Sequence, residues 1–215
     1  MPGPKPLGNM WSGEGISVDE RGALHLGHGP LLAASVEIWE KSPTPLGYGT
    51  YSFAVTVPKN LDKYLTFGMF TWDDDIPGDG NDYAGDAFHR EIDVEVGRWG
   101  WDEDPNAYQF VVQPWGVAEN IHRQPFPLVD GEENIDITFS VLWGPQRVIF
   151  STLSGHGPKS VLINQWDFPA RERVPRPGGV LTAGARVHLN LWSNDALGAS
   201  RATQVVVHAF NFTPL

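Results

Sequence analysis

The sequence predicts an all-β fold, and three observations support this class. The 24 glycines and 18 prolines interrupt the chain at short intervals. No window of a dozen residues keeps apolar side chains at helical spacing. Several short segments instead alternate apolar and polar residues with a period of two, as half-buried strands do. With about ten such segments, we expect two antiparallel sheets packed face to face.

The clearest strands show which residues should form the core. The segment "NIDITFSVLW" places Ile135, Ile137, Phe139, Val141 and Trp143 on one face, so Trp143 is expected inside. The segment "YSFAVTV" alternates in the same way through Tyr51, Phe53, Val55 and Val57. Further candidate strands are "ASVEIWE", "YLTFGMFTW", "REIDVEV", "AYQFVVQPW", "RVIFSTL", "SVLINQW", "RVHLNLWS" and "TQVVVHAFNF".

The remaining segments are expected to be turns and loops. Turn clusters such as "SGHGP" and "PRPGG" separate the strands, and "DDDIPGDGNDYAGD" and "FPARERVPRPGG" are interpreted as loops. We interpret "HLGH", with His25 and His28, as a polar turn. The 215 residues suffice for one core and show no internal repeat or linker, so a single domain over 1–215 is predicted.

Composition excludes several classes of function. Acidic residues outnumber basic ones by 26 to 15, and no dense Lys/Arg stripe is present, which argues against binding to nucleic acid or anionic membranes. Cysteine is absent, so disulfides, thiolate metal sites and cysteine nucleophiles are excluded. No apolar run approaches the roughly 18 residues of a membrane span. The start, "MPGPKPLGNMW", lacks the regions of a signal peptide, so either the protein is cytoplasmic or a leader was removed.

The stretch "HREIDVEVGRWG" carries the strongest chemical signal. Glu91, Asp93 and Glu95 alternate with Ile92 and Val94, so an extended strand would place the three acids on one face. A solvated outer face is the simple alternative. However, like charges side by side on a strand repel each other, and this row has no basic residues beside it to balance them.

Aromatic and amide side chains occupy matching faces of other strands. These groups are Glu37 with Trp39, Phe70 with Trp72, Gln109 and Gln113 with Trp115, and His188 and Asn190 with Trp192. Flat rings contact the C–H faces of sugar rings, and polar groups bind hydroxyls, so this combination predicts a sugar site. Any single Trp could instead pack in the core or at an edge. Trp72, Trp115 and Trp192 are the better candidates for sugar platforms.

Two carboxylates on either side of a glycosidic bond can act as acid and base. A gap of about 5–5.5 Å gives retention through a covalent intermediate, and a wider gap gives inversion. At about 3.3 Å per residue, the Cα atoms of Glu91 and Glu95 are roughly 13 Å apart, so the strand must bend for the two to converge. Asp93 between them could hydrogen-bond the nucleophile, while the acidic row raises the pKa of whichever Glu holds a proton.

The motif "EIDVE" resembles the ExDxE motif of glycoside hydrolase family 16, in the unbulged form of lichenases and xyloglucan-active members. Further segments resemble the family in the same order along the chain: "LGYGTYSFAVTVPKN", "FGMFTW", "ITFSVLWGPQRVIF" and "HLNLW". The resemblance implies a concanavalin A-like β-jelly-roll sandwich of two antiparallel sheets with a concave substrate cleft. It also implies a secreted enzyme that degrades polysaccharide.

Carried over to this chain, the family pattern makes Glu91 the nucleophile, Asp93 its assisting residue and Glu95 the general acid/base. Glu37 resembles a substrate-binding Glu, Phe88 stands where the family often has Trp, and Asn190 and Trp192 fall on its "NLW" strand. Some positions depart from the family, namely Ile137 and Leu142 in the hairpin, Val111 and Val112 after "QF", and Trp39 in place of an Arg. Arg98, Trp99 and Trp101 follow the motif, and we expect them to hold the substrate preference.

The sequence therefore predicts a retaining endo-β-glycanase acting on a polysaccharide, foremost a β-glucan, as a monomer that requires no cofactor. The alternatives are a non-catalytic glycan-binding module and a transglycosylase. No metal ligands are assigned. Asp75, Asp79, Gly80 and Asp86 have EF-hand-like offsets, but Pro77 occupies a ligand position, and we expect a solvated loop. The resemblance leaves a structural calcium open, and the absence of HExxH argues against zinc catalysis.

Overall fold

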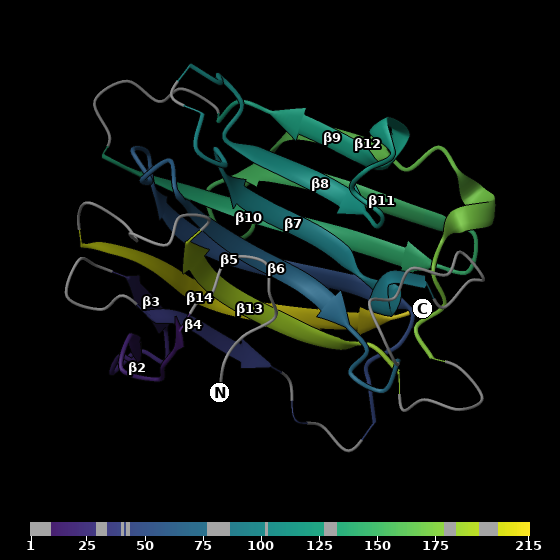
Figure 1. The fold of residues 1–215 in the computed structure, drawn as a ribbon, viewed down its shortest axis with the longest axis horizontal. Helices are drawn as coiled ribbons and strands as arrows, with labels where there is room; N and C mark the ends of the chain where they lie inside the picture. The colour runs from purple at the N-terminus through teal and green to yellow at the C-terminus, as the bar shows by residue number, and fades with distance from the viewer. Residues whose placement is uncertain are drawn as a thin grey trace.

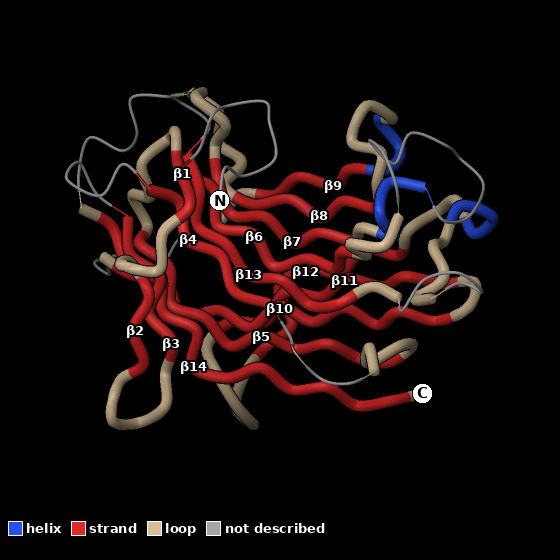
Figure 2. Tube along the Cα trace, turned by 60° about the horizontal axis from the view of Figure 1, so that its bottom comes forward, coloured by secondary structure: helices blue, strands red, loops and turns tan. Residues whose placement is uncertain are grey.

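The computed structural model describes residues 10–28, 34–39, 41, 44–76, 87–101, 103–126, 133–178, 184–193 and 202–215, and only the backbone of residues 10, 34–39 and 87. Within these residues, fourteen strands form two sheets of seven strands each (Figure 1). Figure 2 shows the two sheets as layers, one above the other. The predicted two-sheet sandwich is confirmed.

The first sheet has the order β1 (Met10–Trp11), β4 (Ala34–Trp39), β13 (Arg186–Ser193), β6 (Leu65–Trp72), β7 (Ile92–Gly97), β8 (Tyr108–Val112) and β9 (Ile121–Gln124). The second has the order β12 (Val161–Asp167), β11 (Arg147–Ser154), β10 (Asn134–Gly144), β5 (Gly49–Pro58), β14 (Thr203–Pro214), β3 (Leu24–His28) and β2 (Ile16–Val18). Neighbouring strands are antiparallel, except that the two-residue β1 runs parallel to β4. Three 3₁₀ turns complete the described elements: η1 (Ala87–Arg90), η2 (Ala118–Asn120) and η3 (Arg171–Arg173).

The core lies between the sheets and contains the residues that the alternation predicts. The inward residues of β10 and β5 are buried, namely Ile135, Ile137, Phe139, Val141, Trp143, Tyr51, Phe53, Val55 and Val57. Rings from the two sheets meet there: Phe110 of β8 stacks on Phe150 of β11 at 4.8 Å between centroids. The buried indole of Trp143 donates its Nε1–H to the carbonyl of Pro175 at 2.9 Å, which satisfies its one polar atom.

The prediction of a polar turn for "HLGH" is wrong, because this segment is strand β3. It pairs with Thr203–Val207 of β14 on one side and with β2 on the other. Leu26 is fully buried and His28 nearly so, which means that the period of two continues through the segment despite its polar residues. The expected strand "AYQFVVQPW" ends at Val112, since Pro114 has no N–H to donate to a ladder.

Strand β7, which carries the acidic motif, begins after an unusual turn. Phe88, His89 and Arg90 have φ angles of 51°, 54° and 58°, a left-handed conformation that costs non-glycine residues roughly 1–2 kcal/mol each. Buried contacts hold this turn. Arg90 donates Nε–H to Asp73 Oδ2 at 2.8 Å and Nη1–H to Arg176 O at 2.9 Å.

His89 is fixed as well. Its Nδ1–H donates to the carbonyl of Asp73 at 2.9 Å, and its ring stacks on Trp72 with 3.9 Å between centroids. The backbone N–H of Asp73 in turn donates to His89 O at 2.8 Å. The turn is therefore locked to the end of β6, and this determines where Glu91 lies. Among the described residues, no helix has the length and apolarity needed to cross a membrane.

We expect Arg90→Leu to lower the free energy of unfolding by about 3–5 kcal/mol, because it leaves the Asp73 carboxylate buried without its ion-pair partner. Urea unfolding followed by tryptophan fluorescence measures the loss. The matched control is Arg147→Leu, which removes an exposed ion pair to Asp167 and should cost at most about 1 kcal/mol. Equal losses in the two variants would contradict the role given to the buried pair.

Candidate active site

The three carboxylates lie on one side of β7, as predicted. Asp93 and Glu95 belong to the strand and Glu91 directly precedes it, while Ile92 and Val94 point into the core. We call the outer side of the first sheet around these acids the carboxylate face. The face is not a freely solvated surface, since the Asp93 side chain is only 3% exposed.

Strand register places two rows of residues across the carboxylate face. One row contains Glu37 of β4, Asn190 of β13, Gly68 of β6, Glu95 of β7, Gln109 of β8 and Arg123 of β9. The next row contains Trp39, His188, Phe70, Asp93, Val111 and Ile121. Glu37 and Trp39 are placed by backbone register alone, because their side chains lie outside the described part of the structure. The rows bring predicted site residues from four strands together.

Two amides bind the carboxylates. Gln109 donates Nε2–H to Glu95 Oε2 at 2.5 Å, and Gln113 donates Nε2–H to Asp93 Oδ2 at 2.9 Å. The Gln113 amide is itself held, because its Oε1 accepts the backbone N–H of Trp115 at 2.7 Å. Each glutamine therefore orients one acid.

Burial is the main electrostatic feature of the site. Burial raises the pKa of Asp93 well above its ordinary value, and the negative charges of Glu91 and Glu95 raise it further. A hydrogen bond to Glu91 also favours the protonated form of Asp93, while the bond from Gln113 opposes it. Burial likewise raises the pKa of Glu95, against the opposing effects of Gln109 and the positive charge of Arg123. Such a row can keep protons at a pH where solvated carboxyls have lost them.

Aromatic residues lie at both ends of the carboxylate face. Trp72 follows Phe70 toward the Glu91 end and stacks on His89, and Trp115 beside Gln113 is 71% exposed. At the other end, Trp192 pairs with Thr66 in the row beyond Glu95. The guanidinium of Arg123 lies over the ring of Trp99, with its Cζ 4.9 Å from the centroid.

Arg98 lies away from the carboxylate face, and Phe88 lies in the turn directly before Glu91, whose backbone N–H donates to Phe88 O at 3.0 Å. Arg98 follows the alternation of the inward residues of β7 and donates Nη2–H to Leu61 O at 3.1 Å. It lines a pocket at the end of the sandwich with Asp104 and Phe126, so the structure does not bring it to the carboxylate face. Phe88 is partly buried in the left-handed turn before Glu91.

Gly68 separates the polar groups of the Glu95 row. A Cβ at this position would lie 2.6 Å from the amide oxygen of Asn190, closer than real side chains approach. The absence of a side chain at residue 68 therefore leaves room for Asn190 beside the acids.

The sequence reasoning missed Arg123 and its partner. Arg123 forms an ion pair with Asp104 at 2.6 Å and faces both Trp99 and the Glu95 side chain. It lies on the four-residue strand β9, which has no strong alternation of its own. The position of Arg123 near Glu95 follows only from the pairing of β9 with β8, which sets Arg123 opposite Gln109.

The structure leaves the acidic loop untested. Asp79, Gly80 and Asp86 lie outside the described residues. Asp75 is described, and its backbone N–H donates to Asp73 Oδ1 at 3.1 Å. A calcium ion in this protein stays a prediction.

Comparisons with known proteins identify the fold. No family model and no curated protein matches the sequence. Solved structures do: the β-glucanase of Bacillus licheniformis is 17% identical with a TM-score of 0.64, and the match covers 99% of this chain and 88% of that one. A Bacteroides ovatus mixed-linkage glucan GH16 protein in complex with a G4G4G3G product is 15% identical, with coverage of 94% and 87% and a TM-score of 0.57.

A third structure, described as an immunostimulatory antigen and pseudo β-1,3-glucanase of Mycobacterium tuberculosis, is 16% identical. Its match covers 100% of this chain and 88% of that one, with a TM-score of 0.60. At these identities the likeness shows the fold alone. The protein has the jelly-roll sandwich found in β-glucanases, including those of glycoside hydrolase family 16.

We expect Asp93→Asn to raise the free energy of unfolding. Folding raises the pKa of Asp93, so its carboxyl keeps a proton in the folded state at pH values where the unfolded state has lost it. The free energy of unfolding of the unaltered protein therefore falls as pH rises from the ordinary pKa of Asp to the raised pKa. Asn keeps one acceptor for Gln113 and one donor for Glu91 without titrating. Urea unfolding at several pH values should show a gain that grows with pH across this window. A gain that does not change with pH would contradict the burial of an ionisable Asp93.

Proposed function

We propose that the protein is a retaining endo-β-glycanase of the glycoside hydrolase family 16 type, acting on a β-glucan. The observation that carries this proposal is the row of three carboxylates on β7 with Asp93 buried between the two glutamates. Glu91 attacks the anomeric carbon and forms a covalent glycosyl ester while Glu95 protonates the departing oxygen. Glu95 then removes a proton from the water that cleaves this ester, and Glu91 is released as a carboxylate.

The environments of the two glutamates support this division of roles. A general acid must hold a proton until the leaving oxygen takes it, and burial raises the pKa of Glu95 in the required direction. A nucleophile must be ionised, and protonated Asp93 can donate a hydrogen bond to Glu91 that stabilises the charged form. Asp93 therefore supports the nucleophile without touching the leaving group.

The surroundings support a carbohydrate substrate. The polar row from Asn190 through Gln109 to Arg123 offers donors and acceptors for hydroxyl groups. Trp115 and Trp192, near opposite ends of the acidic row, offer flat apolar faces to sugar rings. The Bacteroides ovatus structure of the same fold holds a glucan oligosaccharide product, and this supports a glucan as the ligand class.

We expect Glu91→Ala and Glu95→Ala each to lower kcat on mixed-linkage glucan by several orders of magnitude, and azide to distinguish them. Azide needs no deprotonation, so with an activated aryl glycoside it can replace the missing group. Glu95→Ala should yield a glycosyl azide of retained configuration, through the ester on Glu91. Glu91→Ala should yield the inverted azide by direct attack. NMR of the products gives the configuration.

The reverse pattern of azide products would mean that Glu95 is the nucleophile and Glu91 the general acid/base. Glu103→Ala is the matched control, a glutamate in the loop that follows β7, and it should hydrolyse glucan at the unaltered rate. Full activity in the Glu91→Ala protein would overturn the mechanism.

We expect Gln109→Leu to shift the alkaline limb of the kcat/KM profile to higher pH. Gln109 stabilises the charged form of Glu95, so its loss raises the pKa of this acid further. Because the general acid must be protonated, activity should persist to higher pH than in the unaltered enzyme. Gln165→Leu, which changes an exposed glutamine of β12, should leave the profile in place. An alkaline limb that moves to lower pH in Gln109→Leu would contradict the assignment of Glu95.

A glycan-binding protein without turnover is the second candidate. The Mycobacterium tuberculosis structure of the same fold is described as a pseudo β-1,3-glucanase, and this description supports keeping a protein without turnover as a candidate. A panel of mixed-linkage glucan, laminarin and xyloglucan separates the two candidates. Retarded migration in affinity electrophoresis without new reducing ends would favour binding alone. Longer products in the presence of acceptor sugars would instead identify a transglycosylase.

A further inference from the structure

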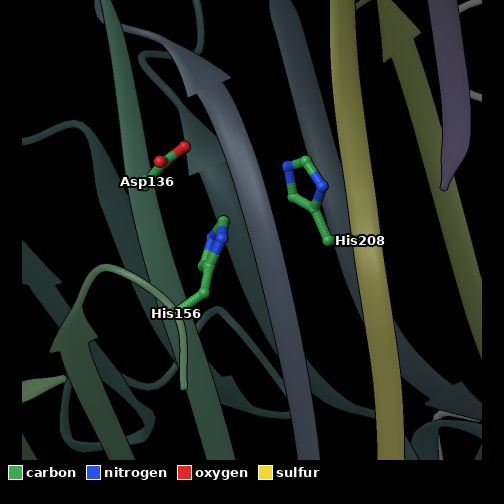
Figure 3. A group of neighbouring side chains, drawn as sticks. All are labelled: Asp136, His156 and His208. Carbon is green, nitrogen blue, oxygen red and sulfur yellow. The ribbon is translucent and has the colours of Figure 1, made fainter. Parts of the chain in front are cut away.

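A cluster of two histidines and one aspartate lies on the outer face of the second sheet, away from the carboxylate face. Asp136 comes from β10, His156 from the turn after β11 and His208 from β14. Their potential ligand atoms all lie within 4.8 Å of one another. Figure 3 shows Asp136 and His156 on one side of β5 and His208 on the other, with its ring turned toward them.

Local backbone geometry places both histidines. His156 stands between Gly155 and Gly157, whose φ angles of 69° and 82° suit glycine, and the turn folds back because Gly155 N–H donates to Asp136 O at 2.8 Å. His208 lies where the register of β14 against β5 shifts, between Val207 and Ala209. A bulge of this kind redirects a side chain relative to the regular pleat.

The hydrogen bonds leave ligand capacity in the cluster. His156 Nε2 lies 3.0 Å from the carbonyl of Val55, which can only accept, so Nε2 carries the proton and Nδ1 keeps its lone pair. Thr56 Oγ1 donates to Asp136 Oδ1 at 2.5 Å and lies 2.7 Å from His208 Nε2. Asp136 Oδ2 has no role in these bonds. A backbone carbonyl that orients an imidazole through its second nitrogen is the usual support of a metal-binding histidine.

We propose that Asp136, His156 and His208 bind a zinc ion. Imidazole nitrogens suit zinc, whereas calcium and magnesium take oxygen ligands, so two histidines select against the latter ions. Ligands at about 2.0–2.2 Å in a tetrahedron lie roughly 3.3 Å apart, so the side chains must close together by up to about 1.5 Å. Asp136 and His208 are exposed, so their side chains can turn toward the ion by giving up their bonds to Thr56, and water completes the tetrahedron.

Zinc binding at His208 Nε2 would displace the proton that this nitrogen now donates to Thr56 Oγ1, whose own proton goes to Asp136. It would also join the β10–β11 hairpin to β14, which lies much later in the sequence. The unfolded chain holds no such arrangement, so the ion stabilises the folded state. The site uses different residues and a different ion from the calcium considered for the acidic loop, and it does not depend on the proposed glycanase activity.

Titration of the metal-free, full-length protein with ZnCl₂ in a calorimeter tests the site. We expect one zinc per chain, a rise of Tm with zinc but not with CaCl₂, and at least about tenfold weaker binding in His208→Ala. The matched control is His25→Ala, which removes a partly buried histidine of β3 on the same sheet that pairs with Asp19 at 3.2 Å. It should bind zinc with the unaltered affinity.

Cobalt(II) gives a second readout that does not depend on stability. Its visible absorption should show the intense bands of a tetrahedral site in the unaltered protein and in His25→Ala, and these bands should be lost in His156→Gln. Because Asp136 and His208 are exposed, the Tm of His208→Ala without metal should equal that of the unaltered protein. The absence of one-site zinc binding, or equal affinity in His208→Ala and His25→Ala, would overturn the proposal.

Discussion

The structure depends on keeping three neighbouring carboxyl groups on one side of one strand. Side by side and largely removed from water, Glu91, Asp93 and Glu95 would repel each other if all were ionised. Asp93 retains its proton more strongly than an ordinary aspartate, and amides from β8 and from the residue after its end bind Glu95 and Asp93. Arg123, one strand further away, supplies opposite charge. The row is therefore stable only within a sheet that places these partners in register.

Contacts that lie outside the acidic row position β7, the strand that carries the acids. The left-handed turn at Phe88–Arg90 is conformationally unfavourable for these residue types, and buried contacts from Asp73, Trp72 and Arg176 compensate for it. Fold and site are coupled here, because the same contacts that hold the turn also set the start of β7. On the other side of the sandwich, a bulge and a glycine-flanked turn shape the cluster at His156 and His208 in a comparable way.

Much of this arrangement could be predicted from the sequence. Alternation in "NIDITFSVLW" and "REIDVEV" placed the core residues and the acids on their correct faces, because burial on one side of a strand leaves a period of two. Two short strands are harder to predict: "HLGH" of β3 has the polar residues of a turn, and β9 with Arg123 has no strong alternation. Their positions follow from pairing with distant strands. The direction of the Arg98 side chain, likewise, depends on where the loop at Leu61 lies in space.

Gly68 has a consequence for how this surface can change during evolution. It lies between Asn190 and Glu95 in one row, and any added side chain would collide with the Asn190 amide. A substitution there would thus disturb a neighbouring polar group without altering any acid. Sequences that drift at residue 68 would keep all three carboxylates and still lose the shape of the surface around them, so a motif search would continue to count them as intact.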